Sequence, residues 1–316
     1  MKKLLIVLLS AVLLLNCFAG CGAQEAPPDI VVTIFPLYDF VRVILGDNPA
    51  GLKIELLQKS GTDLHNYQPS AEDVAMIGMS KLFVYIGGES DEWADAALET
   101  VNGSGAVCRM AEAVTLLEEE TVEGMQAAEE EEEEEGAADE HIWLSLRNAQ
   151  KMVQRLCDEL CSFDASNADT YRANTAAYLE SLTALDADYA AAVADAEYHT
   201  VLVADRFPFR YLTADYGLDY YAAFAGCAAS LDVSFETVAF LSEKLKELQL
   251  PAVLIIDGSD GAIAQTVLDS AGTDAKILTL HSCQCVSAKE LEDGANYLEI
   301  MKNNLEILKE ALGGCH

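Results

Sequence analysis

Residues 168–196 read ADTYRANTAAYLESLTALDADYAAAVADA, a run rich in alanine and leucine that contains neither proline nor glycine. This composition is typical of one long α-helix, because alanine and leucine are strong helix formers and nothing in the run interrupts it. At about 1.5 Å per residue the helix would span roughly 43 Å, which is longer than a usual domain helix. We therefore expect a strut that joins two lobes. The alternative is two shorter helices that break near Leu185 and Asp186.

Short β-branched runs alternate with helical patterns on both sides of this segment. The expected strands are residues 29–35, 52–57, 82–86, 106–110, 200–205, 220–224, 252–257 and 276–280. The expected helices between and after them are residues 37–45, 71–79, 93–101, 148–160, 207–215, 234–248, 261–270 and 296–312. Such alternation predicts parallel sheets with helices on both faces. The predicted fold is α/β, with two similar lobes, each a mostly parallel sheet flanked by helices, at residues 29–160 and 198–316. One long rigid helix in the linking segment, residues 161–197, joins them.

The N-terminus has the pattern of an export signal. Two lysines precede an apolar run at residues 4–15, and small residues follow before Cys21. The segment 18–21, FAGC, resembles a bacterial lipobox, although Phe18 is bulkier than the usual first residue. The resemblance implies a lipoprotein signal peptide at residues 1–20, a lipid on the Cys21 sulfur, and a tether at residues 21–28. An ordinary secretory signal, with Cys21 as a plain residue, is the alternative.

The formal net charge is −34, and acidic residues concentrate in a loop at residues 118–140. This charge argues against nucleic acid and anionic membrane surfaces as partners, because like charges would meet. The consecutive carboxylates Glu129 to Glu135 repel one another and indicate a solvated loop. The loop ends in His141, which is followed by apolar residues suited to a core. It is either only a solvated loop or a collector that raises the local cation concentration.

Three of the five histidines lie where the expected strands or the acidic loop end. They are His65, His141 and His281, and Asp205 ends a further strand. Ligands gather at the carboxyl ends of strands in parallel α/β sheets. Three imidazoles and one carboxylate make a four-coordinate site suited to Zn²⁺. The residues are scattered along the chain, so each histidine could equally be a capped or solvated residue.

Four segments resemble the metal-binding lipoproteins of ABC importers for zinc and manganese, and the match covers nearly all of the mature chain. They are residues 34–38 (IFPLY), 63–69 (DLHNYQP), 84–88 (VYIGG) and 140–144 (EHIWL). In that family the second and fourth motifs each supply one metal-binding histidine, which here are His65 and His141. The resemblance implies two α/β lobes joined by a long helix, with the metal between them. The acidic loop resembles the zinc-type subgroup.

The second lobe departs from the family pattern. The family usually has a histidine or glutamate after the first strand of this lobe, but residues 203–211 (VADRFPFRY) contain neither. Asp205 is the nearest donor. The manganese members carry an aspartate before a serine at a later strand end, and His281 stands there in this chain. We therefore assign His281 as a ligand, and Asp257, near the same sheet edge, is a rival carboxylate.

Nine cysteines occur, and export would place those of the mature chain where disulfides persist. Cys283 and Cys285 follow His281 closely. They are either thiolate ligands or partners in disulfides, with Cys227–Cys283 as the candidate pair. Cys157 and Cys161 lie one helical turn apart and either pair or are buried singly.

These features predict a non-enzymatic receptor that captures Zn²⁺ between two lobes and delivers it to an ABC transporter permease. We expect a monomer, anchored by lipid to the cell membrane on its extracytoplasmic face. A manganese receptor of the same family is the alternative. A zinc hydrolase is less favoured, because the sequence has no HExxH motif and no evident general base. Some relatives share a role in cell adhesion, on which the sequence is silent.

Overall fold

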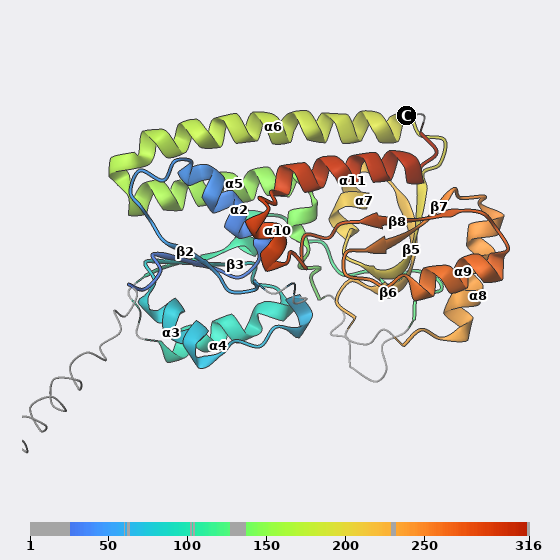
Figure 1. Cartoon of the computed structure of the whole chain (residues 1–316), viewed down its shortest axis with the longest axis horizontal. Helices are drawn as coiled ribbons and strands as arrows, with labels where there is room; N and C mark the ends of the chain where they lie inside the picture. Colours follow the sequence, from blue (N-terminus) through green and yellow to red (C-terminus); the bar gives the residue numbers. More distant parts are fainter. Residues whose placement is uncertain are drawn as a thin grey trace, which may run out of the picture.

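The computed structural model describes residues 26–59, 61, 64–101, 103, 105–126, 137–228 and 232–314. Two lobes lie side by side beneath a long helix (Figure 1), and each contains a four-stranded sheet. The predicted α/β fold of two lobes with parallel sheets is confirmed. The signal peptide with Cys21, and the run Glu129 to Glu135, lie outside the described residues.

The first lobe is built on a parallel sheet of order β2-β1-β3-β4. Its strands are β1 (Ile30–Val32), β2 (Ile54–Leu56), β3 (Leu82–Tyr85) and β4 (Ala106–Arg109). Alternate residues face opposite sides, as the period of a strand requires. Ile30 and Val84 pack with α2 (Phe35–Leu45) and α5 (Leu146–Phe163). Val31 and Phe83 face the layer of α3 (Ala71–Met79) and α4 (Glu92–Thr100).

The second lobe repeats this arrangement with the order β6-β5-β7-β8, also all parallel. Its strands are β5 (Thr200–Phe207), β6 (Asp219–Ala225), β7 (Ala252–Ile256) and β8 (Lys276–Leu280). Its helices are α7 (Arg210–Tyr216), α8 (Phe235–Glu247), α9 (Ala262–Ala271), α10 (Ala288–Glu292) and α11 (Tyr297–Ala311). One face of the sheet packs on α8 and α9. The other face joins α11 and the long helix in a core that continues into the first lobe.

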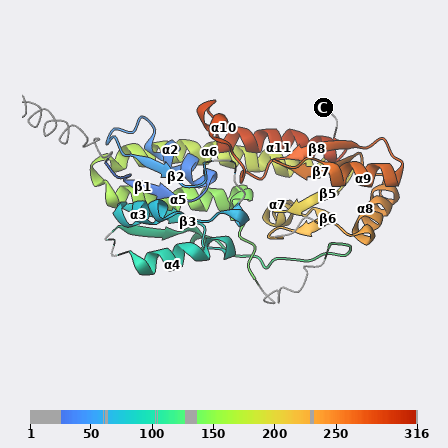
Figure 2. The ribbon, with the colours of Figure 1, turned by 60° about the horizontal axis from the view of Figure 1, so that its bottom comes forward.

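The long helix is α6 (Ala168–Ala194), and it is continuous, so the alternative of two helices is wrong. Its buried side chains recur at spacings of three and four, which places them on one stripe of the helix. They include Tyr171, Tyr178, Leu182 and Tyr189. Figures 1 and 2 show α6 running over both lobes, along α5 and α11. One hydrophobic cluster therefore extends through both lobes beneath this helix.

The chain differs from the expectation after the first strand of the second lobe. Strand β5 runs on to Phe207, with a register shift between Val203 and Arg206, and α7 begins only at Arg210. The irregular strand and Pro208 delay the start of the helix, because proline disfavours helical geometry in the residue before it, here Phe207. The short helix α10 was not predicted; Ser287 and Glu290 begin it with a reciprocal cap. Among the described helices, none has the length and apolarity that a membrane span needs.

Candidate metal centre

Two of the predicted histidines meet where the lobes join. His65 lies on the 3₁₀ turn η1 (Leu64–Asn66), and His141 immediately precedes the 3₁₀ turn η4 (Ile142–Leu144). Their ring centroids are 5.4 Å apart. Donor atoms of His65, His141 and Glu140 all lie within 4.8 Å of one another. The side chains are almost inaccessible, with exposed fractions of 7% for His65, 1% for Glu140 and 0% for His141.

Asp139 orients the His141 ring. Its Oδ1 accepts the His141 backbone N–H at 2.8 Å and lies 3.1 Å from His141 Nδ1. A proton on Nδ1 directed at this carboxylate leaves the lone pair on Nε2, as in the carboxylate–histidine pairs of metal sites. His141 Nε2 is buried, and no described residue forms a hydrogen bond with it. The Tyr211 hydroxyl of the second lobe donates to the Asp139 carbonyl at 2.7 Å, so both lobes position the ring.

Ser90 organises the other half of the cluster from the 3₁₀ turn η2 (Glu89–Asp91). Its hydroxyl donates to Glu140 Oε1 at 2.5 Å, and its backbone N–H donates to Glu140 Oε2 at 3.0 Å. His65 Nδ1 lies 2.8 Å from the Ser90 hydroxyl oxygen. Because the hydroxyl proton is committed to Glu140, the bond to His65 needs a proton on Nδ1. The metal-binding lone pair of His65 is then on Nε2.

Burial and charge act against each other in this cluster. Burial raises the pKa of Glu140, and the neighbouring His141 and the Ser90 hydrogen bonds lower it only in part. Burial lowers the pKa of His141, but the carboxylates of Asp139 and Glu140 outweigh it and hold the pKa above its ordinary value. The metal-free cluster therefore holds a proton readily, and a divalent cation would replace that proton.

Gly88 makes room for Glu140. A Cβ at position 88 would lie 2.3 Å from the Glu140 Cβ, which no real contact allows. The preceding Gly87 has φ +87°, and the Arg109 guanidinium donates to its carbonyl at 2.6 Å. A glycine pair after β3 therefore lets the chain pass close to the cluster.

The second-lobe donors predicted from sequence are not part of this cluster. His281 Nδ1 accepts the Cys283 backbone N–H at 2.9 Å. Asp257 accepts the backbone N–H groups of Ser282 and Cys285 and thereby shapes the loop after β8. Asp205 Oδ1 accepts its neighbour's backbone N–H at 2.9 Å. None of these three residues belongs to the group that could hold a metal among the described residues.

Cys227 and Cys283, the candidate disulfide pair, are both free thiols in the structure. Cys283 is fully buried in the hydrophobic core. Cys227 lies just after β6, where its sulfur faces Glu140 at 3.8 Å. Cys283 therefore lies in the apolar core, whereas Cys227 lies beside the metal cluster.

A family model described as "Zinc-uptake complex component A periplasmic" (ZnuA) matches residues 30–311. The chain belongs to the ZnuA family. A zinc-binding lipoprotein AdcA of Streptococcus pneumoniae is 30% identical over 98% of this chain and 61% of its own length. The chain thus spans about three fifths of that relative. The high-affinity zinc uptake system protein ZnuA of Bacillus subtilis is 29% identical over 92% of this chain and 90% of its own.

Solved structures of this family have the same fold. The Zn(II)-bound ZnuA-like domain of S. pneumoniae AdcA has a TM-score of 0.73 at 28% identity, over 90% of this chain and 99% of that one. The metal-dependent lipoprotein YcdH of B. subtilis has a TM-score of 0.74 at 26% identity, over 90% of this chain and 98% of that one. The family resemblance predicted from the four motifs is therefore confirmed.

Sequence reasoning missed Glu140 and Ser90. Glu140 stands inside one of the ZnuA-like motifs, directly before His141, and adjacency alone could have nominated it. Ser90 carries no such signal. It reaches Glu140 across 50 positions of sequence, so only the folded chain brings the two together.

Replacing Asp139 by alanine should weaken metal binding without removing a ligand. Without the carboxylate, neither the orientation of the His141 ring nor the position of its proton is fixed. Loss of such a hydrogen-bond partner typically lowers metal affinity about tenfold to a hundredfold. Zinc titration calorimetry measures the change, with Asp139→Asn as a milder variant that keeps an acceptor oxygen. Unchanged affinity in Asp139→Ala would show that the carboxylate does not orient the ligand.

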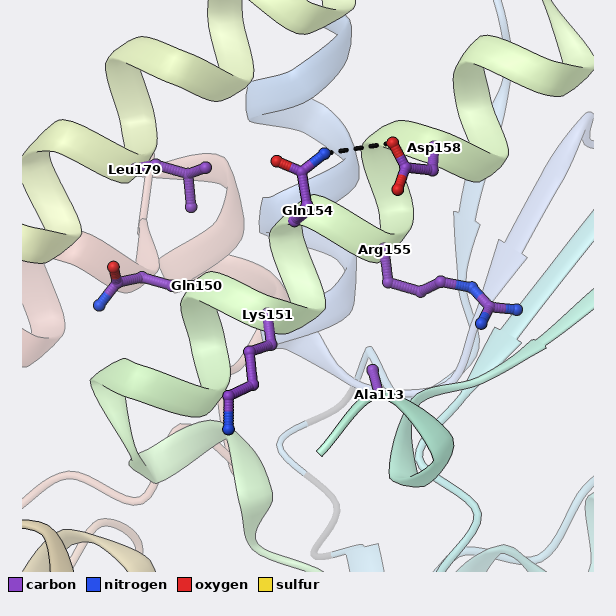
Figure 3. Close-up of a pocket in the computed structure, with 7 residues that line it drawn as sticks. All are labelled: Ala113, Gln150, Lys151, Gln154, Arg155, Asp158 and Leu179. Atoms are coloured by element: carbon purple, nitrogen blue, oxygen red, sulfur yellow. Dashed lines mark hydrogen bonds between the residues drawn. The ribbon is translucent and has the colours of Figure 1, made fainter. Parts of the chain in front are cut away.

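A separate cavity of about 510 Å³ lies between α5 and α6 and shares no lining residue with the metal cluster (Figure 3). Its lining residues are Ala113, Gln150, Lys151, Gln154, Arg155, Asp158 and Leu179. It contains no histidine or cysteine, and two of its side chains are cationic. This cavity therefore does not offer the ligand set of a divalent metal.

Proposed function

We propose that the protein is a receptor for Zn²⁺ that serves zinc uptake, with His65, Glu140 and His141 as ligands. The observation that carries this proposal is the buried cluster of two imidazoles and one carboxylate at the junction of the lobes. Imidazole nitrogen and carboxylate oxygen are ordinary zinc ligands. Two relatives, a zinc-binding lipoprotein and a high-affinity zinc uptake protein, support the choice of metal.

We further propose that the receptor delivers its zinc to an ABC permease at the membrane. The lipobox-like segment at residues 18–21 supports anchoring through Cys21 on the extracytoplasmic face, with residues 21–28 as the tether. The net charge of −34 favours the approach of cations. The protein is also proposed to be a monomer that holds and releases its metal without bond-making chemistry.

Titration calorimetry of metal-free protein with Zn²⁺ and, separately, with Mn²⁺ tests the proposed metal. One Zn²⁺ per chain should bind, and more tightly than Mn²⁺, because imidazole suits zinc better than it suits manganese. The alternative of a manganese receptor would be favoured by tighter Mn²⁺ binding. A protein that binds neither Zn²⁺ nor Mn²⁺ would refute the proposal.

Zinc affinity should fall as the pH falls. The pKa of His141 is raised in the metal-free protein, so this imidazole is protonated below that pKa and zinc must displace the proton. Above the raised pKa, His141 no longer lowers the affinity. Below it the affinity drops by about tenfold per pH unit for each displaced proton. The loss should begin above the ordinary histidine value of about 6.5.

Competition between the protein and a zinc chelator across a pH series measures this dependence. The chelator's own proton binding is corrected at each pH, so the remaining slope belongs to the protein. His141→Ala is the informative comparison, because its residual binding should lose the part of the slope that His141 contributes. An affinity that stays constant from about pH 8 to about pH 5 would contradict histidine ligation.

A further inference from the structure

The loop after β6 brings the second lobe into contact with His141. A Cβ at Gly226 would lie 3.1 Å from His141 Cε1, 3.3 Å from its Nδ1 and 3.0 Å from the Phe207 carbonyl oxygen. Only glycine lets the backbone approach this closely without displacing the ring. The next residue, Cys227, is anchored by its backbone N–H, which donates to Glu119 Oε1 at 3.0 Å. The loop is therefore held against the metal cluster at two successive residues.

The Cys227 sulfur lies at the edge of that cluster. Its Sγ is 3.8 Å from Oε1 of Glu140, one of the three residues in the group. With bonds of about 2.3 Å to sulfur and about 2.0 Å to oxygen, two ligands of one tetrahedral zinc lie about 3.5 Å apart. The observed separation is close to that spacing. Small adjustments would allow sulfur and carboxylate to share one ion.

The cluster has three candidate ligands, one fewer than zinc usually has, so a fourth could come from the second lobe. His65, Glu140 and His141 all come from the first lobe, and a structural zinc site usually has four ligands. His281, Asp205, Asp257 and Cys227 all lie outside the group, but the Cys227 sulfur is 3.8 Å from a carboxylate oxygen of Glu140. His141 Nε2 is fully buried and has no hydrogen-bond partner among the described residues. This nitrogen independently marks the point where an ion would bind.

We propose that the Cys227 thiolate is the zinc ligand contributed by the second lobe and that it selects zinc over manganese. This inference rests on the proposed function. As the bond from zinc to sulfur forms, the thiol proton leaves to solvent, and no oxidant or reductant takes part. A thiolate is a soft ligand that favours zinc, whereas manganese prefers oxygen donors. Cys227 thus joins the two lobes through the ion and discriminates against the harder metal.

The test uses Co²⁺ as a spectroscopic substitute for zinc in the full-length wild-type protein under reducing conditions. A thiolate bound to Co²⁺ gives a charge-transfer absorption in the near ultraviolet, which imidazole and carboxylate ligands do not give. We expect this band in the wild type, its loss in Cys227→Ser, and its retention in Cys285→Ser, the matched thiol control. Zinc affinity of Cys227→Ser should fall about a hundredfold, the loss expected for one of four ligands. Its manganese affinity should change by less than about threefold.

The outcomes separate this inference from the proposed function. A wild-type protein that binds Co²⁺ and Zn²⁺ without the band overturns the role of Cys227 and leaves the zinc receptor standing. A wild-type protein that binds neither ion overturns both. Absence of the band in the wild type overturns the assignment without any variant. Where the band is present, its loss in a folded Cys227→Ser or Cys227→Ala protein, as judged by circular dichroism, assigns it to Cys227. A band that survives in Cys227→Ser but disappears in Cys285→Ser also overturns the assignment.

Discussion

His141→Ala should lower zinc affinity by about a hundredfold or more. The imidazole is fully buried, its orientation is set by Asp139, and its Nε2 has no other described partner. Structural zinc in proteins is held by about 10–16 kcal/mol, so one of four ligands contributes about 3 kcal/mol, which corresponds to a factor of about a hundred. Titration calorimetry, or competition with a chelator when binding is tight, measures the difference.

His199→Ala is the matched control, because it removes an imidazole that is exposed at the start of β5. Its zinc affinity should equal that of the wild type. His65→Ala should reproduce the loss seen for His141→Ala, since both rings belong to the same group. Wild-type affinity in both His65→Ala and His141→Ala would refute this site even if the protein binds zinc elsewhere.

Trp143→Ala should lower the free energy of unfolding by about 4 kcal/mol, because removing a fully buried tryptophan leaves a large cavity. The indole Nε1–H also donates to the Ser282 carbonyl at 2.8 Å, which links η4 to the loop after β8. The Tyr297 hydroxyl of α11 donates to the Trp143 carbonyl at 2.5 Å. The side chain therefore stabilises the contact between the lobes. Urea unfolding of the metal-free protein, followed by circular dichroism, measures the loss.

Two further variants test the roles of the Trp143 hydrogen bond and of its burial. Trp143→Phe keeps an aromatic ring and loses the donor, so its destabilisation should be clearly smaller. Trp93→Ala removes a tryptophan that is only partly buried, and it should cost less than Trp143→Ala. An effect of Trp143→Ala below about 1 kcal/mol would contradict the buried, bridging position described above.

Much of the fold could be predicted because its signals are local. Helix α3, for example, begins with a capping box in which Ser70 and Asp73, only three residues apart, each accept the other's backbone N–H. The composition of residues 168–196 predicted a single helix, and α6 ends at Ala194. The end of β5 could not be predicted, because its register shift depends on pairing with β6, which lies further along the chain.

The site was predictable only where its residues lie within family motifs. His65 and His141 were nominated from such motifs, and the structure brings them together. The assignment of His281 relied on its position at a strand end, but the hydrogen bond from Cys283 to its Nδ1 is a property of the folded loop. Which strand end turns toward the cluster depends on how the two sheets are oriented. A periodic pattern in the sequence does not contain that information.

The acidic segment does not remain with the first lobe, to which sequence assigned it. Its described part before residue 127 crosses to the second sheet, where the Gln126 N–H donates to the Ala223 carbonyl of β6 at 2.8 Å (Figure 2). Arg210 of α7 pairs with Glu120 at 3.0 Å. An isolated antiparallel β-bridge between Glu118 and Ala138 joins the two ends of the acidic loop. Local composition identified this loop but could not indicate which lobe it would contact.

The hydrophobic cluster beneath α6 has a consequence for how the protein can be divided. Tyr178 and Tyr189 lie on one helix. The Tyr178 ring packs at a tilt against Phe40 of α2, and the Tyr189 hydroxyl donates to the Met301 carbonyl of α11. A truncated chain holding either half alone would expose an apolar stripe of this helix to water. We therefore expect that neither half folds autonomously and that dissection of the chain into separately expressed fragments yields aggregates instead of two small soluble domains.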